Sequence, residues 1–217
     1  MDKAIFERHG FTMKTRLLVE NWRKFLNESS SGKKFSVGLV PMSAKPFHEG
    51  HMTLIRKAAE ECDDVIVYVS TSDRKKKGEH PILGSDMKSI WDNILEGILP
   101  SNVSCEYGGS PVRNVYVKLE EGLQEENLDK HYAIYTGEED AGRYSEKYFQ
   151  DMIDRVSIET MARGEDTMAI SGTLMRQHIA NDNINDFKAG LPSELSDSQK
   201  DEIFNTLKGS QYQLPLS

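Results

Sequence analysis

The segment DVIVYVS, residues 64–70, constrains the fold more than any other part of the chain, because it is apolar at nearly every position. A strand of this composition is buried on both faces, which is typical of the parallel sheets of α/β proteins. Four other short runs are rich in apolar and β-branched residues: 35–40, 102–107, 131–136 and 156–162. We take these runs as the candidate strands.

Segments with helical spacing of apolar residues lie between and after the candidate strands. They are residues 53–61, 85–98, 112–124, 144–152, 173–180, 185–189 and 197–207. Strands that alternate with helices predict a parallel sheet that is covered on both faces. We therefore predict an α/β fold with a Rossmann-like, doubly wound parallel sheet of about five strands.

The beginning of the chain does not follow this alternation. Residues 14–26, KTRLLVENWRKFL, have the pattern of an amphipathic helix, and SSSG at 29–32 is typical of a loop or linker. We expect an N-terminal helical extension over residues 1–32 and a single domain over residues 33–217 that ends in helices.

Charge and composition exclude several classes of partner. The net charge of −8 argues against broad binding to nucleic acids, which requires a basic face. No window approaches the roughly 18 apolar residues of a membrane span, and the first residues lack the apolar core of a signal peptide. Cys62 and Cys105 have no metal-type spacing and suggest reduced thiols. We expect a cytoplasmic protein with no nucleic-acid or membrane partner.

Unusual residues follow the ends of the candidate strands, which is where ligands bind in doubly wound sheets. His48 and His51 lie at the start of a predicted helix, with Gly50 between them. A helix start favours phosphate groups, a glycine lets the backbone approach a ligand, and imidazoles can donate hydrogen bonds to phosphate oxygens. On spacing alone, two surface histidines at a helix cap remain the alternative.

Two motifs resemble signatures of the nucleotidylyltransferase superfamily. PMSAKPFHEGHMTLI, residues 41–55, is similar to the HxGH motif, in the PFHxGH form of nicotinamide-mononucleotide adenylyltransferases. ISGTLMR, residues 170–176, is similar to ISSTxxR, with Gly172 in place of the second serine. VIVYVSTSDRKKKG, residues 65–78, resembles the segment after the second strand in phosphopantetheine adenylyltransferases. The resemblance implies the HIGH-type nucleotidylyltransferase fold.

The resemblance also implies roles for individual residues. The expected catalytic residues are Lys45, His48, His51 and Arg176. The expected nucleotide-binding residues are Ser43, Ala44, Pro46, Phe47, Gly50, Ser171, Gly172 and Thr173. Lys75 or Lys76 matches a phosphate-binding lysine, and position after a strand adds Arg113 and Arg143 as substrate-binding candidates. For Lys45 an ordinary surface position is the alternative, and for Lys75 and Lys76 it is a solvated loop. No dedicated metal site is predicted.

The implied reaction transfers a nucleoside monophosphate, with AMP from ATP as the first choice, to a phosphate-bearing acceptor such as nicotinamide mononucleotide. Pyrophosphate is released, and Mg²⁺ accompanies the nucleoside triphosphate. Cytidylyl transfer to a phosphoalcohol or sugar phosphate is the enzymatic alternative. A non-catalytic nucleotide-binding module is the alternative from another class. Members of this superfamily often form multimers, so the resemblance is compatible with a homo-oligomer.

Overall fold

The computed structural model describes residues 32–162 and 170–210 of the chain. The chain divides into two compact units, Met1–Lys34 and Phe35–Ser217. The helix expected at residues 14–26 lies outside the described residues, and the domain boundary near residue 33 stays a prediction. The second unit contains the sheet and all the candidate site residues.

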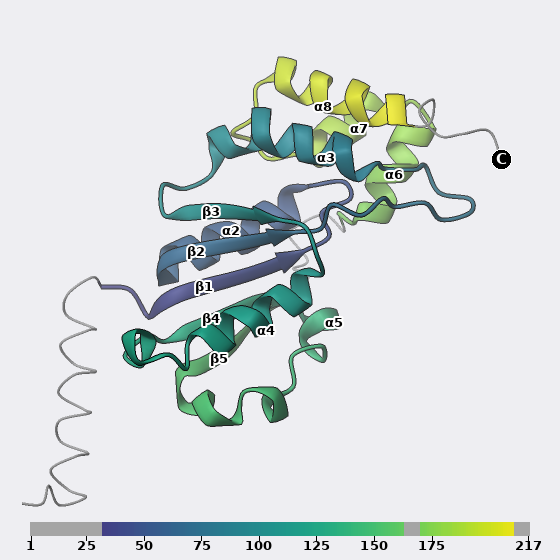
Figure 1. Ribbon diagram of the computed structural model, residues 1–217. Coiled ribbons are helices and arrows are strands. Elements are labelled where there is room, and N and C mark those ends of the chain that lie inside the picture. Colours follow the sequence, from purple (N-terminus) through teal and green to yellow (C-terminus); the bar gives the residue numbers. More distant parts are fainter. Residues whose placement is uncertain (1–31, 163–169, 211–217) are drawn as a thin grey trace, which may run out of the picture. The chain divides into compact units, whose positions relative to one another are not determined.

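The sheet has five parallel strands in the order β3-β2-β1-β4-β5 (Figure 1). The strands are β1 (Phe35–Met42), β2 (Cys62–Val69), β3 (Val103–Tyr107), β4 (Tyr132–Gly137) and β5 (Val156–Met161). The predicted α/β fold with a parallel sheet is confirmed. Since the strand order reverses at β1, the carboxyl ends of β1 and β4 flank the switch point of the sheet.

Helices cover both faces of the sheet. They are α2 (Glu49–Glu61), α3 (Gly84–Ile90), α4 (Pro111–Glu121), α5 (Glu138–Ala141), α6 (Gly172–Ala180), α7 (Ile184–Ala189) and α8 (Asp197–Gly209). After α3 the helix continues as a π-helical segment, Trp91–Leu95, and a 3₁₀ turn, Glu96–Ile98. The larger core cluster joins one face of the sheet to α2, α3 and α6–α8, whereas the smaller one joins the other face to α4.

The helix predicted over residues 144–152 is wrong. The segment contains only 3₁₀ turns, at Glu146–Tyr148 and Gln150–Arg155. Phe149 and Met152 have ψ angles of 34° and 24° at φ near −137°, outside the helical region. This geometry buries the side chains of Tyr144, Phe149 and Met152 against the second face of the sheet. Burial of these side chains thus overrides local helical propensity.

A close contact fixes the loop between β2 and α3. The backbone of Gly84, the first residue of α3, passes directly beside the carbonyl of Thr71. A Cβ atom on Gly84 would lie 1.7 Å from that carbonyl oxygen. The Gly84 N–H also donates a hydrogen bond to the Asp73 carboxylate at 2.9 Å. Only glycine fits this crossing, which brings the loop after β2 back over its own start.

We therefore expect Gly84→Ala to lower the free energy of unfolding by about 1–3 kcal/mol, because the backbone must move to admit the methyl group. Gly97→Ala is the matched control, since nothing lies within 4 Å of its Cβ position. Urea denaturation of both variants measures the effect. Equal midpoints for the two variants would contradict the close crossing.

Candidate active site

Three segments that are far apart in sequence meet at the carboxyl edge of the sheet. They are the loop after β1, the loop after β2 and the first turn of α6. The Ser70 N–H donates to the Met42 carbonyl at 3.2 Å, which joins the first two segments. The Arg176 guanidinium donates to the Lys45 carbonyl at 2.6 Å, which joins the first to the third. The structure thus brings the HxGH-like and ISSTxxR-like motifs together, although they are more than 100 residues apart.

The two histidines form one unit at the start of α2. Their ring centroids lie 3.9 Å apart with an interplanar angle of 35°. The backbone N–H of His48 donates to Nδ1 of His51 at 3.3 Å, and the His51 N–H donates to the His48 carbonyl at 2.9 Å. His48 is buried and His51 is half-buried. Both rings therefore have restricted orientations before any ligand arrives.

This geometry determines the proton arrangement on His51. Burial, and then the neighbouring His48, lower the pKa of His51 well below its usual value, so the ring is neutral at pH 7. Because Nδ1 accepts a hydrogen bond, the proton of the neutral ring resides on Nε2. His51 is thus a fixed hydrogen-bond donor through Nε2, which is suited to an oxygen that becomes negative during a reaction.

Phe47 and Gly50 support the histidine pair. Phe47 is 2% exposed; it stacks on His51 at 5.6 Å and meets Trp91 edge to face at 4.9 Å. A Cβ atom on Gly50 would lie 3.2 Å from the His48 ring. Both residues thus contact the histidines, and their predicted role in nucleotide binding stays a prediction. The first N–H of α2, that of Glu49, is also engaged by the Gly190 carbonyl at 2.9 Å.

Lys45 is a buried cation between the two loops. Its side chain is buried, and Nζ donates to the Ser70 carbonyl at 2.8 Å. Burial lowers the pKa of Lys45 to about 8, against the opposing charge of Asp73. Lys45 is therefore not an ordinary surface lysine. It is mostly charged at pH 7 and poorly hydrated, a state in which an anionic ligand would stabilise it.

Arg176 is held by three protein groups at once. Its guanidinium donates to the Lys45 carbonyl at 2.6 Å and to the Thr173 hydroxyl at 2.9 Å. Nε lies 2.9 Å from a carboxylate oxygen of Glu79. Burial lowers the pKa of Arg176, while Glu79 opposes the change, and the side chain stays charged at neutral pH. Arg176 thus links α6 to both loops of the site.

The start of α6 is built to admit this arginine. Ser171 is the N-cap residue, and its hydroxyl accepts from the Leu174 N–H at 3.2 Å. A Cβ on Gly172 would lie 3.2 Å from the Lys45 carbonyl and 3.1 Å from Arg176 Nη1. The departure from the ISSTxxR pattern therefore has a physical reason, because a side chain at position 172 would crowd this contact.

Sequence reasoning missed the polar residues of the loop after β2. Glu79 pairs with Arg176, and Asp73 binds both the Gly84 N–H and Lys75. Ser70 and Ser72 hydrogen bond through their hydroxyls at 2.8 Å. The available signal was a lone Glu79 directly after a dense basic run, RKKKG.

The remaining predicted residues lie around the loops. Ala44 and Pro46 are buried, whereas Ser43 is exposed; Ala44 has φ of 48°, which is strained for a residue with a Cβ. The four predicted substrate-binding residues have exposed side chains and do not join the histidine pair. Lys75 pairs with Asp73 at 2.7 Å, and Lys76 lies 3.7 Å from Glu79. Arg143 pairs with Asp140 at 3.0 Å, and Arg113 is on α4.

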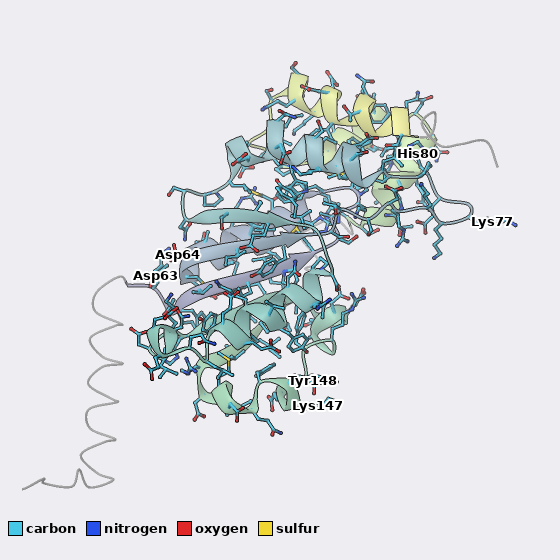
Figure 2. The ribbon with its side chains drawn as sticks, in the orientation of Figure 1. Asp63, Asp64, Lys77, His80, Lys147 and Tyr148 are labelled. Carbon is cyan, nitrogen blue, oxygen red and sulfur yellow. The ribbon has the colours of Figure 1, made fainter. Side chains whose placement is uncertain are left out.

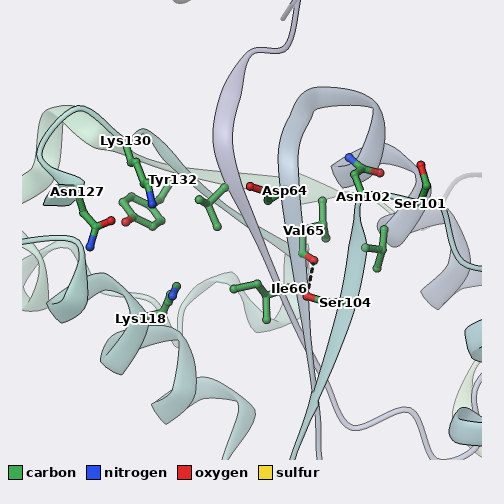
Figure 3. Close-up of a pocket in the computed structure, with 12 residues that line it drawn as sticks. Asp64, Val65, Ile66, Ser101, Asn102, Ser104, Lys118, Asn127, Lys130 and Tyr132 are labelled. Carbon is green, nitrogen blue, oxygen red and sulfur yellow. Dashed lines mark hydrogen bonds between the residues drawn. The ribbon is translucent and has the colours of Figure 1, made fainter.

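A separate hollow of about 380 Å³ lies at the opposite, amino-terminal edge of the sheet (Figure 3). Its lining includes early residues of four strands, together with Lys118, Asn127 and Lys130. In the close-up, Asp64 faces the same hollow as the two lysines. None of the predicted catalytic residues lines it, so this hollow is distinct from the candidate active site.

The described residues contain no group of three or more His, Cys, Asp or Glu side chains that could hold a metal ion. In the described part of the chain, no helix combines the length and the apolar character needed to span a bilayer.

A comparison with known families finds a match over part of the chain. Residues 37–80 match the family model of the citrate lyase ligase C-terminal domain, which is nucleotidylyltransferase-like. The predicted resemblance is confirmed. The matched segment contains Lys45, both histidines and Glu79, and it ends well before α6.

A solved structure also resembles this chain, namely pantoate-beta-alanine ligase from Francisella tularensis, complexed with beta-gamma ATP and beta-alanine. It is 18% identical, the alignment covers 87% of this chain and 84% of that chain, and the TM-score is 0.36.

The low pKa of Lys45 predicts a pH dependence of stability. Between about pH 8 and pH 10.5 the unfolded chain retains the lysine proton more than the folded protein does. The free energy of unfolding therefore rises with pH over this window, by on the order of 2 kcal/mol. Lys45→Met removes this contribution, so the stability of wild type relative to the variant should increase between pH 8 and pH 10.

Urea denaturation at several pH values measures this difference. Lys88→Met is the control, because Lys88 is exposed on α3 and pairs with Asp92. Parallel pH profiles for wild type and Lys45→Met would contradict the burial of a charged lysine.

Proposed function

We propose that this protein is a nucleotidylyltransferase that transfers AMP from ATP to an anionic acceptor. An oxygen of the acceptor attacks the α-phosphorus of ATP, the bond from that phosphorus to the bridging oxygen breaks, and pyrophosphate leaves. The observation that carries the proposal is the fixed His48–His51 pair beside Lys45 and Arg176, at the carboxyl edge of the sheet. The match to a nucleotidylyltransferase-like ligase domain supports nucleotidyl transfer at a coarse level.

The chemistry requires little covalent participation by the protein, so positioning and charge stabilisation dominate. His51 donates from Nε2 to the α-phosphate or its bridging oxygen as negative charge develops. His48 holds His51 through its backbone N–H and flanks the same position. Lys45 approaches from the loop after β1, and Arg176 is held at the start of α6 by the Thr173 hydroxyl. Bound Mg²⁺ would neutralise phosphate charge when it arrives with the nucleotide.

No general base is required for a phosphate acceptor, because it is already an anion at neutral pH. Nicotinamide mononucleotide is our first acceptor and phosphopantetheine the second, on the likeness of the PFHEGH segment. A carboxylate is a further candidate, since the matching domain is described as a ligase and a carboxylate oxygen can attack ATP in the same way. Cytidylyl transfer to a phosphoalcohol or sugar phosphate is the alternative donor reaction.

Pyrophosphate release with Mg²⁺ tests the proposal. ATP and CTP are each paired with nicotinamide mononucleotide, phosphopantetheine, phosphoalcohols, sugar phosphates and small carboxylates. We expect release with ATP and one class of acceptor. Release with CTP alone would replace AMP transfer by CMP transfer. Binding of ATP by calorimetry without release for any pair would favour a non-catalytic nucleotide-binding module.

The role of His51 predicts a separation of turnover from binding. His51→Ala should lower kcat by about 10²–10³-fold, as when a donor to a developing oxyanion is removed. The Kd for ATP should change far less, because the interaction strengthens only in the transition state. His178→Ala, a histidine on α6 outside the pair, is the control. Equal losses in kcat and in ATP affinity would contradict a transition-state role.

A further inference from the structure

Two arginines in the candidate active site share one carboxylate. Oε2 of Glu79 lies 2.9 Å from Nε of Arg176 and accepts hydrogen bonds from Nη2 and Nε of Arg74 at 3.0 and 3.1 Å. Oε1 accepts from Arg74 Nη2 at 3.2 Å and lies 3.7 Å from Nζ of Lys76. Three cations from two segments of the chain therefore converge on a single carboxyl group.

The carboxylate does not balance these charges. Glu79 carries one negative charge against three positive ones, and the Arg176 side chain is only 6% exposed. Both guanidinium groups contact the same oxygen, Oε2 of Glu79, so their positive charges lie close together. Planar guanidinium groups fit phosphate as well as carboxylate, and a phosphate offers more oxygens and more charge. The position of the Glu79 carboxylate is thus better matched to a phosphate group than to a carboxyl group.

The Glu79 side chain can move away from the arginines without breaking the hydrogen bonds that hold its loop in place. Arg74 and Ile82 exchange backbone hydrogen bonds of 2.8 and 3.0 Å, which close the base of the loop. His80 is buried and hydrogen bonds to the Leu207 carbonyl at 2.9 Å. Lys77 lies at the outer end of the loop and points away from the sheet, whereas His80 lies back toward the helices (Figure 2). Rotation of the Glu79 side chain alone would free both arginines and leave these bonds intact.

We propose that Glu79 is an internal substitute for a phosphate group: it occupies the anion position shared by Arg74 and Arg176, and the polyphosphate of the nucleotide displaces it. Arg74 then becomes a phosphate ligand together with Arg176. This inference rests on the proposed function for the identity of the ligand. It adds a phosphate-binding residue that lies outside both sequence motifs, and it explains why the charge of Arg176 is paired within the protein before the nucleotide binds.

Calorimetric titration with inorganic pyrophosphate tests this directly, because it requires neither an acceptor nor turnover. Glu79→Gln removes the competing charge, so the Kd for pyrophosphate should fall at least about tenfold, as expected for loss of one charge-assisted interaction. Adding Arg74→Gln in the Glu79→Gln background should reverse most of this gain. Glu121→Gln, which removes an exposed carboxylate on α4, is the control and should leave the Kd unchanged.

If Glu79 only orients the two arginines, its replacement by Gln should raise the Kd for pyrophosphate instead of lowering it. Unchanged or weaker pyrophosphate binding by a folded Glu79→Gln, or no binding by either protein, overturns the inference. If thermal melting shows that Glu79→Gln is unfolded, Arg74→Gln alone decides: weaker binding than wild type supports the inference, and equal binding overturns it.

The failure of this inference can be told from failure of the proposed function. If Glu79→Gln binds pyrophosphate more tightly but the wild-type protein shows no turnover with any donor and acceptor, the inference is supported and the proposed reaction is ruled out. If the wild-type protein shows turnover but Glu79→Gln gains no affinity for pyrophosphate, the proposed reaction is supported and the inference about Glu79 is overturned.

Discussion

The site depends on one hydrogen bond, from the Arg176 guanidinium to the Lys45 carbonyl at 2.6 Å. This bond joins residues 131 positions apart and brings the start of α6 against the loop after β1. The carbonyl belongs to the same residue whose side chain reaches Ser70 in the loop after β2. Because a buried charged donor is costly to leave unpaired, the bond makes the three segments interdependent. The histidine pair directly follows the loop after β1, so its position depends on the contacts among the three segments.

The sequence predicted the sheet well because its strands are short, apolar and separated by helices with clear spacing. The centre of β2 is apolar throughout, and this composition has few alternatives to a parallel sheet. The start of α2 was less predictable. Glu49 and Gly50 precede the apolar positions of that helix and carry no hydrophobic signal. The helix predicted at residues 144–152 was wrong because contacts with the sheet, and not helical spacing, determine the backbone conformation there.

The site itself was only partly predictable. The two motifs identified the histidines, Lys45 and Arg176, because each contains unusual residue types at fixed spacing. They could not identify Glu79, whose importance depends on its distance to an arginine 97 positions later (176 − 79). They also predicted nucleotide binding by Phe47 and Gly50, which stays a prediction, but not the contacts of both residues with the imidazole rings. A motif can therefore bring its residues together in space without showing which contacts each of them makes.

Trp91, Phe47 and His51 form a continuous series of ring contacts from the centre of the core to the candidate reaction centre. Trp91 is fully buried in the π-helical segment, and Phe47 is 2% exposed. Any repacking that changes the volume at Trp91 would be transmitted to the angle of the His51 ring. The packing of the core and the geometry of the histidine pair are thus coupled at these positions. A variant engineered for heat resistance would have to gain its stability elsewhere, for example on the outer surfaces of α4 or α8.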